Sequence, residues 1–332
     1  MIKILAIESS CDETSAAIIR DGTVLSNLIA NQTIHAEYGG VVPELASRSH
    51  QENIVPVVQS ALSSANSTLQ ELHAIAVTLG PGLMGSLLVG VSFAKTLAYS
   101  LGIPLLAVNH MQAHILAHFA EDPKPKFPFL CLTVSGGHTQ IVLVKNYLEM
   151  EVIGQTLDDA VGEAFDKGGK IFGLGYPAGP LIDKFAKLGS LTVKFPEPQI
   201  EGLNFSFSGV KTAVLYHVQK QVRFDPDYLK NNIHDLCASL QYTLVSILMN
   251  KLIKAANEFN ITEIAIAGGV SANSHLRNEL EMTGRKLGWK TYIPRFEYCT
   301  DNAAMIGIAG YYNYLAGNFS ALDVTPQARM IL

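Results

Sequence analysis

Hydrophobic residues recur along the chain at spacings typical of strands and helices. Short apolar runs that end in polar or glycine-rich segments predict strands, and apolar residues three and four positions apart predict helices. The two patterns alternate along the chain, which predicts an α/β protein. The predicted helices cover residues 44–65, 84–101, 110–120, 159–172, 210–222, 233–258, 273–287 and 301–314.

Two segments of the first half of the chain recur in the second half. ILAIESSCDETSAAII (4–19) and LCLTVSGGHTQIVLVK (130–145) each predict a β-hairpin whose turn consists of small and polar residues. The apolar strand, glycine-rich turn and helix start of residues 73–90 recur at 263–276. These pairs indicate that the chain contains two related copies of one architecture.

A third pair brings polar residues to the same point of both copies. The strand at 103–108 runs into His110, and the strand at 290–294 runs into a polar loop that reaches Asp301. In α/β sheets, ligands bind beyond the carboxyl ends of the strands. The turns of all three pairs follow such strand ends, so we expect the two copies to face each other and the turns to converge on one site.

We expect the two lobes to comprise residues 1–125 and 126–332. The boundary falls in EDPKPKF (121–127), a stretch rich in proline and lysine that is typical of a linker. The hairpin pair recurs at a shorter distance along the chain than the other two pairs. We therefore expect the second lobe to carry an insertion, which we place within about 150–210.

Composition favours a large buried core and argues against several classes of protein. Hydrophobic residues make up 48% of the chain and charged residues 16%, which excludes disorder. We find no apolar stretch of the ~18 residues that span a bilayer and no signal peptide, because residues 1–8 read as a first strand. The four cysteines lie far apart, as expected for reduced thiols in the cytosol. We therefore expect a cytoplasmic protein without membrane association.

Two histidines and an aspartate are candidate metal ligands. His110 and His114 are four residues apart, so on a helix both rings project from one face and can share an ion. Alone, such a pair is equally compatible with two unrelated histidines. The duplication places Asp301 at the equivalent point of the other lobe, and two histidines with one carboxylate form a usual site for iron(II) or zinc. The sequence HMQAH lacks the glutamate of the H-E-x-x-H protease motif.

Glycine-rich turns are candidate nucleotide-binding loops. The turn at 134–139 exposes backbone N–H groups that can hold a phosphate or carboxylate. The turn at 267–273 leads into a helix, where Ser271 or Asn273 can cap the helix or bind a ligand. LGPG (79–82) makes the corresponding turn in the first lobe. One such loop is weak evidence, but three that converge indicate a nucleotide site.

The segment DDAVGEAFDKGGKIFGLGYPAGP (158–180) predicts a helix that carries Asp166 and lysines on its outer face. Gly168 and Gly169 in mid-helix cost roughly 1 kcal/mol each relative to alanine. We expect a ligand or another backbone to approach the helix there. A solvated charged face is the alternative interpretation of this segment.

The order of these motifs resembles that of a known family. The motifs ESSCDET, YGGVVPELASRSH, GPGLMGSLLVG, H-x-x-x-H, VSGGHTQ, DDAVGEAFDK, GLGYPAGP, FSFSGVKT, GGVSAN and CTDNAAMIG are similar to those of the universal tRNA threonylcarbamoyladenosine transferase family (TsaD-like). They span nearly the whole chain and are highly specific as a set. The resemblance implies a duplicated, two-lobed actin-like (ASKHA) fold with RNase H-like mixed sheets flanked by helices.

The resemblance also implies an activity. The threonylcarbamoyl group of threonylcarbamoyl-AMP would move to N6 of adenosine 37 in tRNAs that read codons beginning with adenine, and AMP would leave. One divalent metal ion per subunit, iron (Fe2+) in preference to zinc (Zn2+), would be bound by His110, His114 and Asp301. The implied partners are tRNA, a paralogous actin-like subunit (TsaB-like) and a small ATPase (TsaE-like). The implied contacts to the adenylate are Thr133, Val134, Ser135, Gly136, Gly137, Asp166, Gly179, Asp183 and Asn273.

Some residues depart from the family pattern, and the sequence leaves alternative functions open. Gln112 replaces a frequent glutamate and Ala178 a frequent glycine, and no catalytic role is assigned to the acidic turn of Asp12 and Glu13. A small-molecule kinase, a metalloprotease and a noncatalytic scaffold are the alternative functions. A kinase would have no histidine pair, a protease would need a general base, and a scaffold would lose the metal ligands.

The charge of the chain is unusual for a protein that binds RNA. The net charge is −5, whereas nucleic-acid-binding proteins are usually basic. We therefore expect a local tRNA footprint, or one shared with partner subunits. The densest basic group is Lys167, Lys170, Lys184, Lys187 and Lys194.

Overall fold

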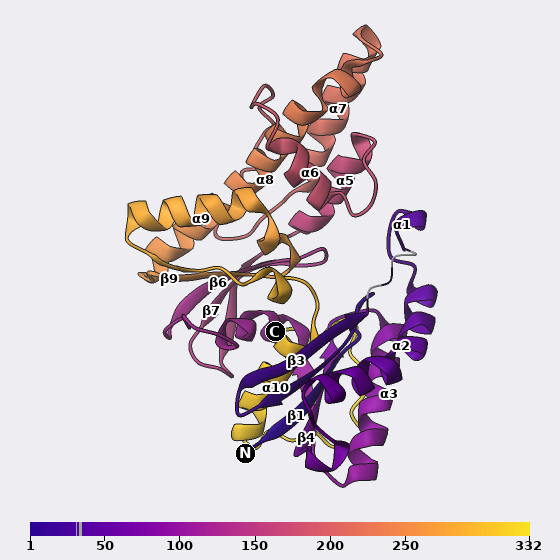
Figure 1. Ribbon diagram of the computed structural model, residues 1–332. Coiled ribbons are helices and arrows are strands. Elements are labelled where there is room, and N and C mark those ends of the chain that lie inside the picture. The colour runs from indigo at the N-terminus through magenta and orange to yellow at the C-terminus, as the bar shows by residue number, and fades with distance from the viewer. Residues whose placement is uncertain (31, 33–34) are drawn as a thin grey trace. The chain divides into compact units, whose positions relative to one another are not determined.

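The structure is a computed structural model that describes residues 1–30, 32 and 35–332. It divides into two compact units (Figure 1). Unit 1 consists of residues 1–125, 145–150 and 294–332, and unit 2 consists of residues 126–144 and 151–293. The first crossing between units falls at the boundary that we expected, but residues 294–332, which we assigned to the second lobe, belong to unit 1.

Unit 1 is built on a five-stranded mixed sheet with the strand order β3-β2-β1-β4-β5. The strands β1 and β2 form the expected antiparallel hairpin, and β3 pairs antiparallel with β2. The strands β4 and β5 continue the sheet in parallel from β1. The bounds are β1 Lys3–Glu8, β2 Thr14–Arg20, β3 Thr23–Ala30, β4 Ala74–Gly80 and β5 Leu105–Asn109.

Unit 2 repeats this topology. Its sheet has the order β10-β9-β6-β7-β8, with β6 antiparallel to β7 and parallel to β9, and with β9 parallel to β10. The three pairs of repeats in the sequence therefore occupy equivalent places in the two sheets, as the duplication predicts. The bounds are β6 Phe129–Val134, β7 Thr139–Val144, β8 Met150–Gln155, β9 Glu263–Ala267 and β10 Lys290–Tyr292.

Helices cover both faces of the sheet in unit 1. Leu5 and Ile7 of β1 lie in a core shared with α2 and α3, whereas the alternate residue Ala6 lies against α10. Because Gly307 of α10 has no side chain, the helix approaches β1 and β2 closely; an added Cβ would lie 2.2 Å from Ile19. This packing holds the last helix in unit 1. The bounds are α1 His35–Tyr38, α2 Pro43–Ser64, α3 Met84–Leu101, α4 His110–Leu116 and α10 Ala303–Leu315.

The C-terminal segment also belongs to unit 1 and runs beside the end of the sheet. Ser320 exchanges hydrogen bonds with the backbone of β5, and the Gln327 N–H donates to Leu79 O over 2.8 Å. A Cβ on Gly80 would lie 1.9 Å from Gln327 O, so this position requires glycine. The side chain of Asn109 donates to Ile331 O over 3.0 Å. The C-terminal segment is thereby bound to the residue that precedes His110.

In unit 2, α7 and the start of α8 extend farthest from the sheet (Figure 1). Gly168 and Gly169 of α5 are explained by helix packing and not by a ligand. A Cβ at Gly168 would lie 2.4 Å from Leu240, and one at Gly169 would lie 2.2 Å from Ala178. The bounds are α5 Val161–Ile171, α6 Gly179–Ala186, α7 Ser208–Phe224, α8 Tyr228–Phe259 and α9 Ser274–Leu287.

Two helices are long and apolar enough to cross a membrane when judged by length and composition alone. They are α3 and α8, each with a window of mean hydropathy 1.3. The expectation that no segment of the chain meets this criterion was therefore wrong. In α8, 72% of the window is buried inside the protein, because this helix forms much of the core of unit 2.

Candidate metal centre and glycine-rich loops

The helix α4 starts directly at the end of β5. The Asn109 side chain caps the helix, because its Oδ1 accepts the N–H groups of Met111 over 2.8 Å and Gln112 over 3.1 Å. Starting the helix at this point places His110 and His114 one turn apart on the same face, as the sequence predicted. Both histidines are buried.

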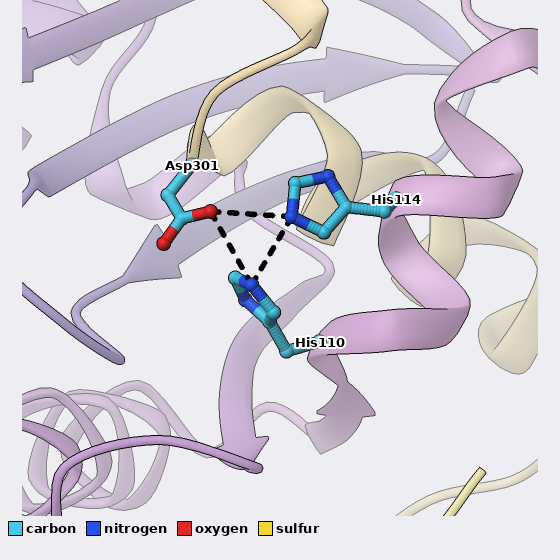
Figure 2. A group of neighbouring side chains, drawn as sticks. All are labelled: His110, His114 and Asp301. Atoms are coloured by element: carbon cyan, nitrogen blue, oxygen red, sulfur yellow. Dashed lines mark hydrogen bonds and ion pairs between the residues drawn. The ribbon is translucent and has the colours of Figure 1, made fainter. Parts of the chain in front are cut away.

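His110, His114 and Asp301 form a compact triangle (Figure 2). The two Nε2 atoms lie 3.1 Å apart. Asp301 Oδ1 lies 3.2 Å from His114 Nε2 and 3.3 Å from His110 Nε2. The rings are nearly perpendicular, at 88°. We expected Asp301 to face the pair from the second lobe, but its segment belongs to unit 1, so the structure builds the whole triangle within one unit.

The triangle fits one divalent metal ion. Three ligand atoms about 3.2 Å apart, each about 2.1 Å from an ion, subtend angles of roughly 100° at that ion. These angles lie between the ligand–metal–ligand angles of octahedral and tetrahedral sites. Two imidazole nitrogens and one carboxylate oxygen on one side of an ion form the donor set of iron(II) and zinc sites that keep open positions. The residues present therefore suit a catalytic metal better than a fully enclosed structural one.

A second carboxylate, Glu8, fixes the orientation of His110. It is fully buried at the end of β1. Its Oε2 accepts His110 Nδ1–H over 3.0 Å and the Thr78 hydroxyl over 2.6 Å, and its Oε1 accepts the Ser10 N–H. Because an ionised carboxylate can only accept, Nδ1 of His110 carries a proton, and Nε2 is the ring nitrogen that is left to bind a metal ion in the triangle.

Sequence reasoning missed Glu8. The available signal was a single acid at the end of the apolar run KILAIE.

The charges of the triangle favour a cation. Burial alone would raise the pKa of Asp301, but His110 and His114 hold that pKa well below its usual range. Burial likewise opposes the charged form of His110, yet Asp301 and Glu8 raise its pKa well above the ordinary value. Burial lowers the pKa of His114. Two carboxylates thus surround the imidazoles, and a bound dication would take over the compensation that one protonated histidine otherwise provides.

The turn after β1 brings further acids close to the triangle. Burial, followed by the negative charges of Asp301 and Asp12, raises the pKa of Glu13 to about 10, so this carboxyl is neutral at pH 7. The buried His50 supports the turn, since its Nε2 donates to Cys11 O over 3.0 Å and its Nδ1 accepts the Thr14 hydroxyl over 2.7 Å. Burial lowers the pKa of His50, which therefore stays neutral. Sequence reasoning also missed His50.

Two of the three glycine-rich loops meet within unit 2, whereas the LGPG loop (79–82) belongs to unit 1. Gly268 has a φ of +89°, and a Cβ there would lie 2.4 Å from Val134 O. A Cβ on Gly162 would lie 2.6 Å from Ser135 O. The loop at 134–137 is therefore held between the turn after β9 and the start of α5. Gly136 and Gly137, in contrast, have open space where a Cβ would be, so their backbone can be approached.

Comparisons with known proteins match this picture. The family model for "tRNA N6-adenosine threonylcarbamoyltransferase" matches residues 23–308. A protein of that name from Christiangramia forsetii is 61% identical, and the match covers 99% of this chain and 98% of that protein. One from Riemerella anatipestifer is 60% identical, and the match covers 98% of this chain and 97% of that protein.

The chain belongs to this family. Its fold is actin-like. The Acidaminococcus fermentans (R)-2-hydroxyglutaryl-CoA dehydratase component A matches 95% of this chain and 100% of its own, with a TM-score of 0.55 and 13% identity. The match to full-length HypF covers 95% of this chain and 46% of the HypF chain, with a TM-score of 0.61 and 14% identity. At these identities the two structures support the fold alone.

The substrate contacts that the resemblance implied differ in their surroundings. Thr133 and Val134 are fully buried in β6, backbone included, so neither is exposed to a ligand in this structure. Ser135, Gly136, Gly137 and Gly179 lie in the loops or at a helix start.

The predicted polar contacts tie the loops of unit 2 together. Asp166 Oδ1 accepts the Ala178 N–H over 2.8 Å, and Asp183 Oδ1 accepts the Ser274 hydroxyl over 2.7 Å. Asn273 caps α9 and donates to Gln241 over 2.7 Å. These three side chains hold the loops in place.

Proposed function

We propose that the chain transfers the threonylcarbamoyl group of threonylcarbamoyl-AMP to N6 of adenosine 37 in tRNAs that read codons beginning with adenine. Its class, a tRNA-modifying transferase, follows from its family. In the reaction, N6 attacks the carbamoyl carbon, the bond from that carbon to the phosphate oxygen breaks, and AMP leaves with the electron pair. The observation that carries the proposal is the triangle of His110, His114 and Asp301 in a chain of this family.

One divalent ion per subunit, iron(II) in preference to zinc, would be held by the triangle. When bound, such an ion supplies Lewis acidity toward a carbonyl or phosphoryl oxygen. Glu8 keeps His110 in the tautomer that binds metal, and the turn from Ser10 to Thr14 is fixed by His50. The residue that removes the proton from N6 is not assigned.

The loops of unit 2 would bind the adenylate. The open backbone at Gly136 and Gly137 suits a phosphate or carboxylate group, because exposed N–H groups attract anions. Asp166, Asp183 and Asn273 would act mainly by holding the loops, given the hydrogen bonds that each already makes. Each can still offer a second polar atom or lone pair to the nucleotide.

The further parts of the proposal concern partners and location. A paralogous actin-like subunit and a small ATPase would assist the reaction in the cytoplasm. The net charge of −5 supports a tRNA surface that is shared with partners.

The double variant His110→Ala/His114→Ala tests the function. Threonylcarbamoyladenosine formed in tRNA is measured by nucleoside mass spectrometry, with the partner subunits and threonylcarbamoyl-AMP present. We expect the wild type to carry about one equivalent of metal and to modify tRNA, and the double variant to do neither while keeping its fold. The exposed His73→Ala is the matched control. Stoichiometric metal or full transfer in the double variant would overturn the proposal.

A further inference from the structure

The helix α7 presents a basic and aromatic surface. Its 17 residues, SGVKTAVLYHVQKQVRF, contain no aspartate or glutamate. Val210, Val214 and Val218 bury one face of the helix. On the opposite side Gln219, Lys220 and Arg223 are exposed, together with Tyr216, which is 66% exposed. We call these four residues the α7 face.

The cations of the α7 face are not neutralised by neighbours. In the part of the chain that the structure describes, Lys220 and Arg223 have no ion pair. Two lysines of the basic group that we selected from the sequence differ, because Lys167 contacts Asp159 at 2.7 Å and Glu163 at 2.8 Å, and Lys187 contacts Asp183 at 3.2 Å. On α7, Lys220 and Arg223 thus lie on one exposed face, and neither forms an ion pair with a residue that the structure describes.

The acids nearest in sequence lie beyond the end of the helix. Asp225 and Asp227 form the turn into α8, where Asp225 Oδ1 accepts the Asp227 N–H over 3.0 Å. They lie past Arg223, and in the part of the chain that the structure describes neither forms an ion pair with Lys220 or Arg223.

The start of α7 is fixed to the rest of unit 2. Asp158 accepts the Phe207 N–H over 2.8 Å, the Ser208 N–H over 3.4 Å and the Ser206 hydroxyl. Burial opposes ionisation of Asp158, but these hydrogen bonds lower its pKa, so the anchor is a stable anion at neutral pH. The motif FSFSGVKT therefore sets the direction of the helix, which also contacts α5.

We propose that the α7 face binds the tRNA substrate. Lys220 and Arg223 would contact phosphates, and Tyr216 would stack on an unpaired base. Exposed cations that alternate with an aromatic ring suit RNA, whose single-stranded loops offer both phosphates and base faces. A small basic surface on a chain of net charge −5 also explains how an acidic protein can hold a polyanion locally. This proposal rests on the proposed function, because that function supplies the RNA.

The test is the charge reversal Lys220→Glu/Arg223→Glu in the full chain with its partner subunits. We expect the Kd for tRNA at low salt to rise at least tenfold. The slope of log K against log salt should become shallower by roughly 1.4 to 1.8, which corresponds to two lost phosphate contacts. The KM for threonylcarbamoyl-AMP should not change. Tyr216→Ala should weaken tRNA binding about 5- to 100-fold, whereas Tyr216→Phe, which keeps the ring, should bind like the wild type.

The matched control is Arg285→Glu/Lys286→Glu at the end of α9, which changes the net charge equally on a helix that also carries acids. Equal tRNA affinity in the α7 variant and this control would overturn the proposal. Loss of partner-subunit binding in the α7 variant, measured by gel filtration, would instead identify a protein interface and also overturn it. tRNA binding is measured separately from transfer, so the two proposals can fail independently. If the α7 variant binds tRNA more weakly but the wild type shows no transfer activity, the proposed function is refuted and the α7 face remains a tRNA-binding surface.

Discussion

Replacing Glu8 by glutamine should weaken metal binding without removing a metal ligand. The carboxylate accepts from His110, Thr78 and Ser10 with only two oxygens. Glutamine keeps one acceptor and introduces an NH2 group, so at least one buried donor faces another donor. If the amide oxygen faces Ser10, His110 loses the acceptor that holds its proton on Nδ1. The variant also removes the negative charge beside the imidazole.

The expected loss is about 10- to 100-fold in metal affinity, the usual effect of removing a carboxylate that orients a histidine ligand. This corresponds to roughly 1.4 to 2.7 kcal/mol. The assay is competition between the metal-free protein and a chromogenic chelator, with zinc in air and iron(II) under anaerobic conditions. Thr78→Val is the matched control, because it removes one donor to Glu8 and leaves the carboxylate and its bond to His110 in place.

Thr78→Val should cost about 1 kcal/mol of folding free energy, the typical net value of one hydrogen bond, with little change in metal affinity. A Glu8→Gln protein that binds metal within twofold of the wild type would refute the reasoning. So would an equal loss in Thr78→Val, because the effect would then come from disturbed packing at the end of β1 and not from the tautomer of His110.

Two further predictions concern unit 2. Asp166→Ala removes the acceptor of the Ala178 N–H at the start of α6, so calorimetry should show adenylate binding weakened by about 1–3 kcal/mol. Asp166→Asn keeps an acceptor oxygen and should lose less binding free energy. Unchanged adenylate affinity in both variants would place the nucleotide elsewhere. The lowered pKa of Asp158 means that its stabilising contribution is present above its unfolded-state pKa and is lost as the pH falls through the folded-state value. Asp158→Asn should therefore be less stable than the wild type at pH 7, and in thermal melts its melting temperature should fall less than that of the wild type below about pH 4. Melting temperatures that fall equally with pH in both proteins would contradict this.

Local patterns were enough to predict most of the fold. The apolar period located α3 at 84–101, as observed, and placed the ends of α2 and α9 within one residue, whereas α8 starts at Tyr228 and not at 233. The repeated segments predicted the shared topology of the two sheets. Such features depend on neighbours in sequence, which is why a single sequence reveals them.

Features that depend on distant contacts were harder to predict. The unit to which Asp301 belongs is set by the packing of α10 on β1 and β2, which no local pattern encodes. The role of Glu8 depends on β4 and α4 meeting at the end of β1. Gly168 and Gly169 looked like a ligand approach in the sequence, but they are needed by the neighbouring side chains of Leu240 and Ala178.

The interrupted path of the chain through unit 1 has a consequence for synthesis on the ribosome. All of unit 2 lies between residues 126 and 293, so it can fold while residues 294–332 are still inside the exit tunnel. Unit 1 cannot. Its sheet lacks α10, the triangle lacks Asp301, and Asn109 lacks its bond to Ile331 until those residues have left the tunnel. A nascent chain that has not yet reached Asp301 therefore presents two histidines without their carboxylate, and the candidate metal site is complete only after Asp301 has emerged.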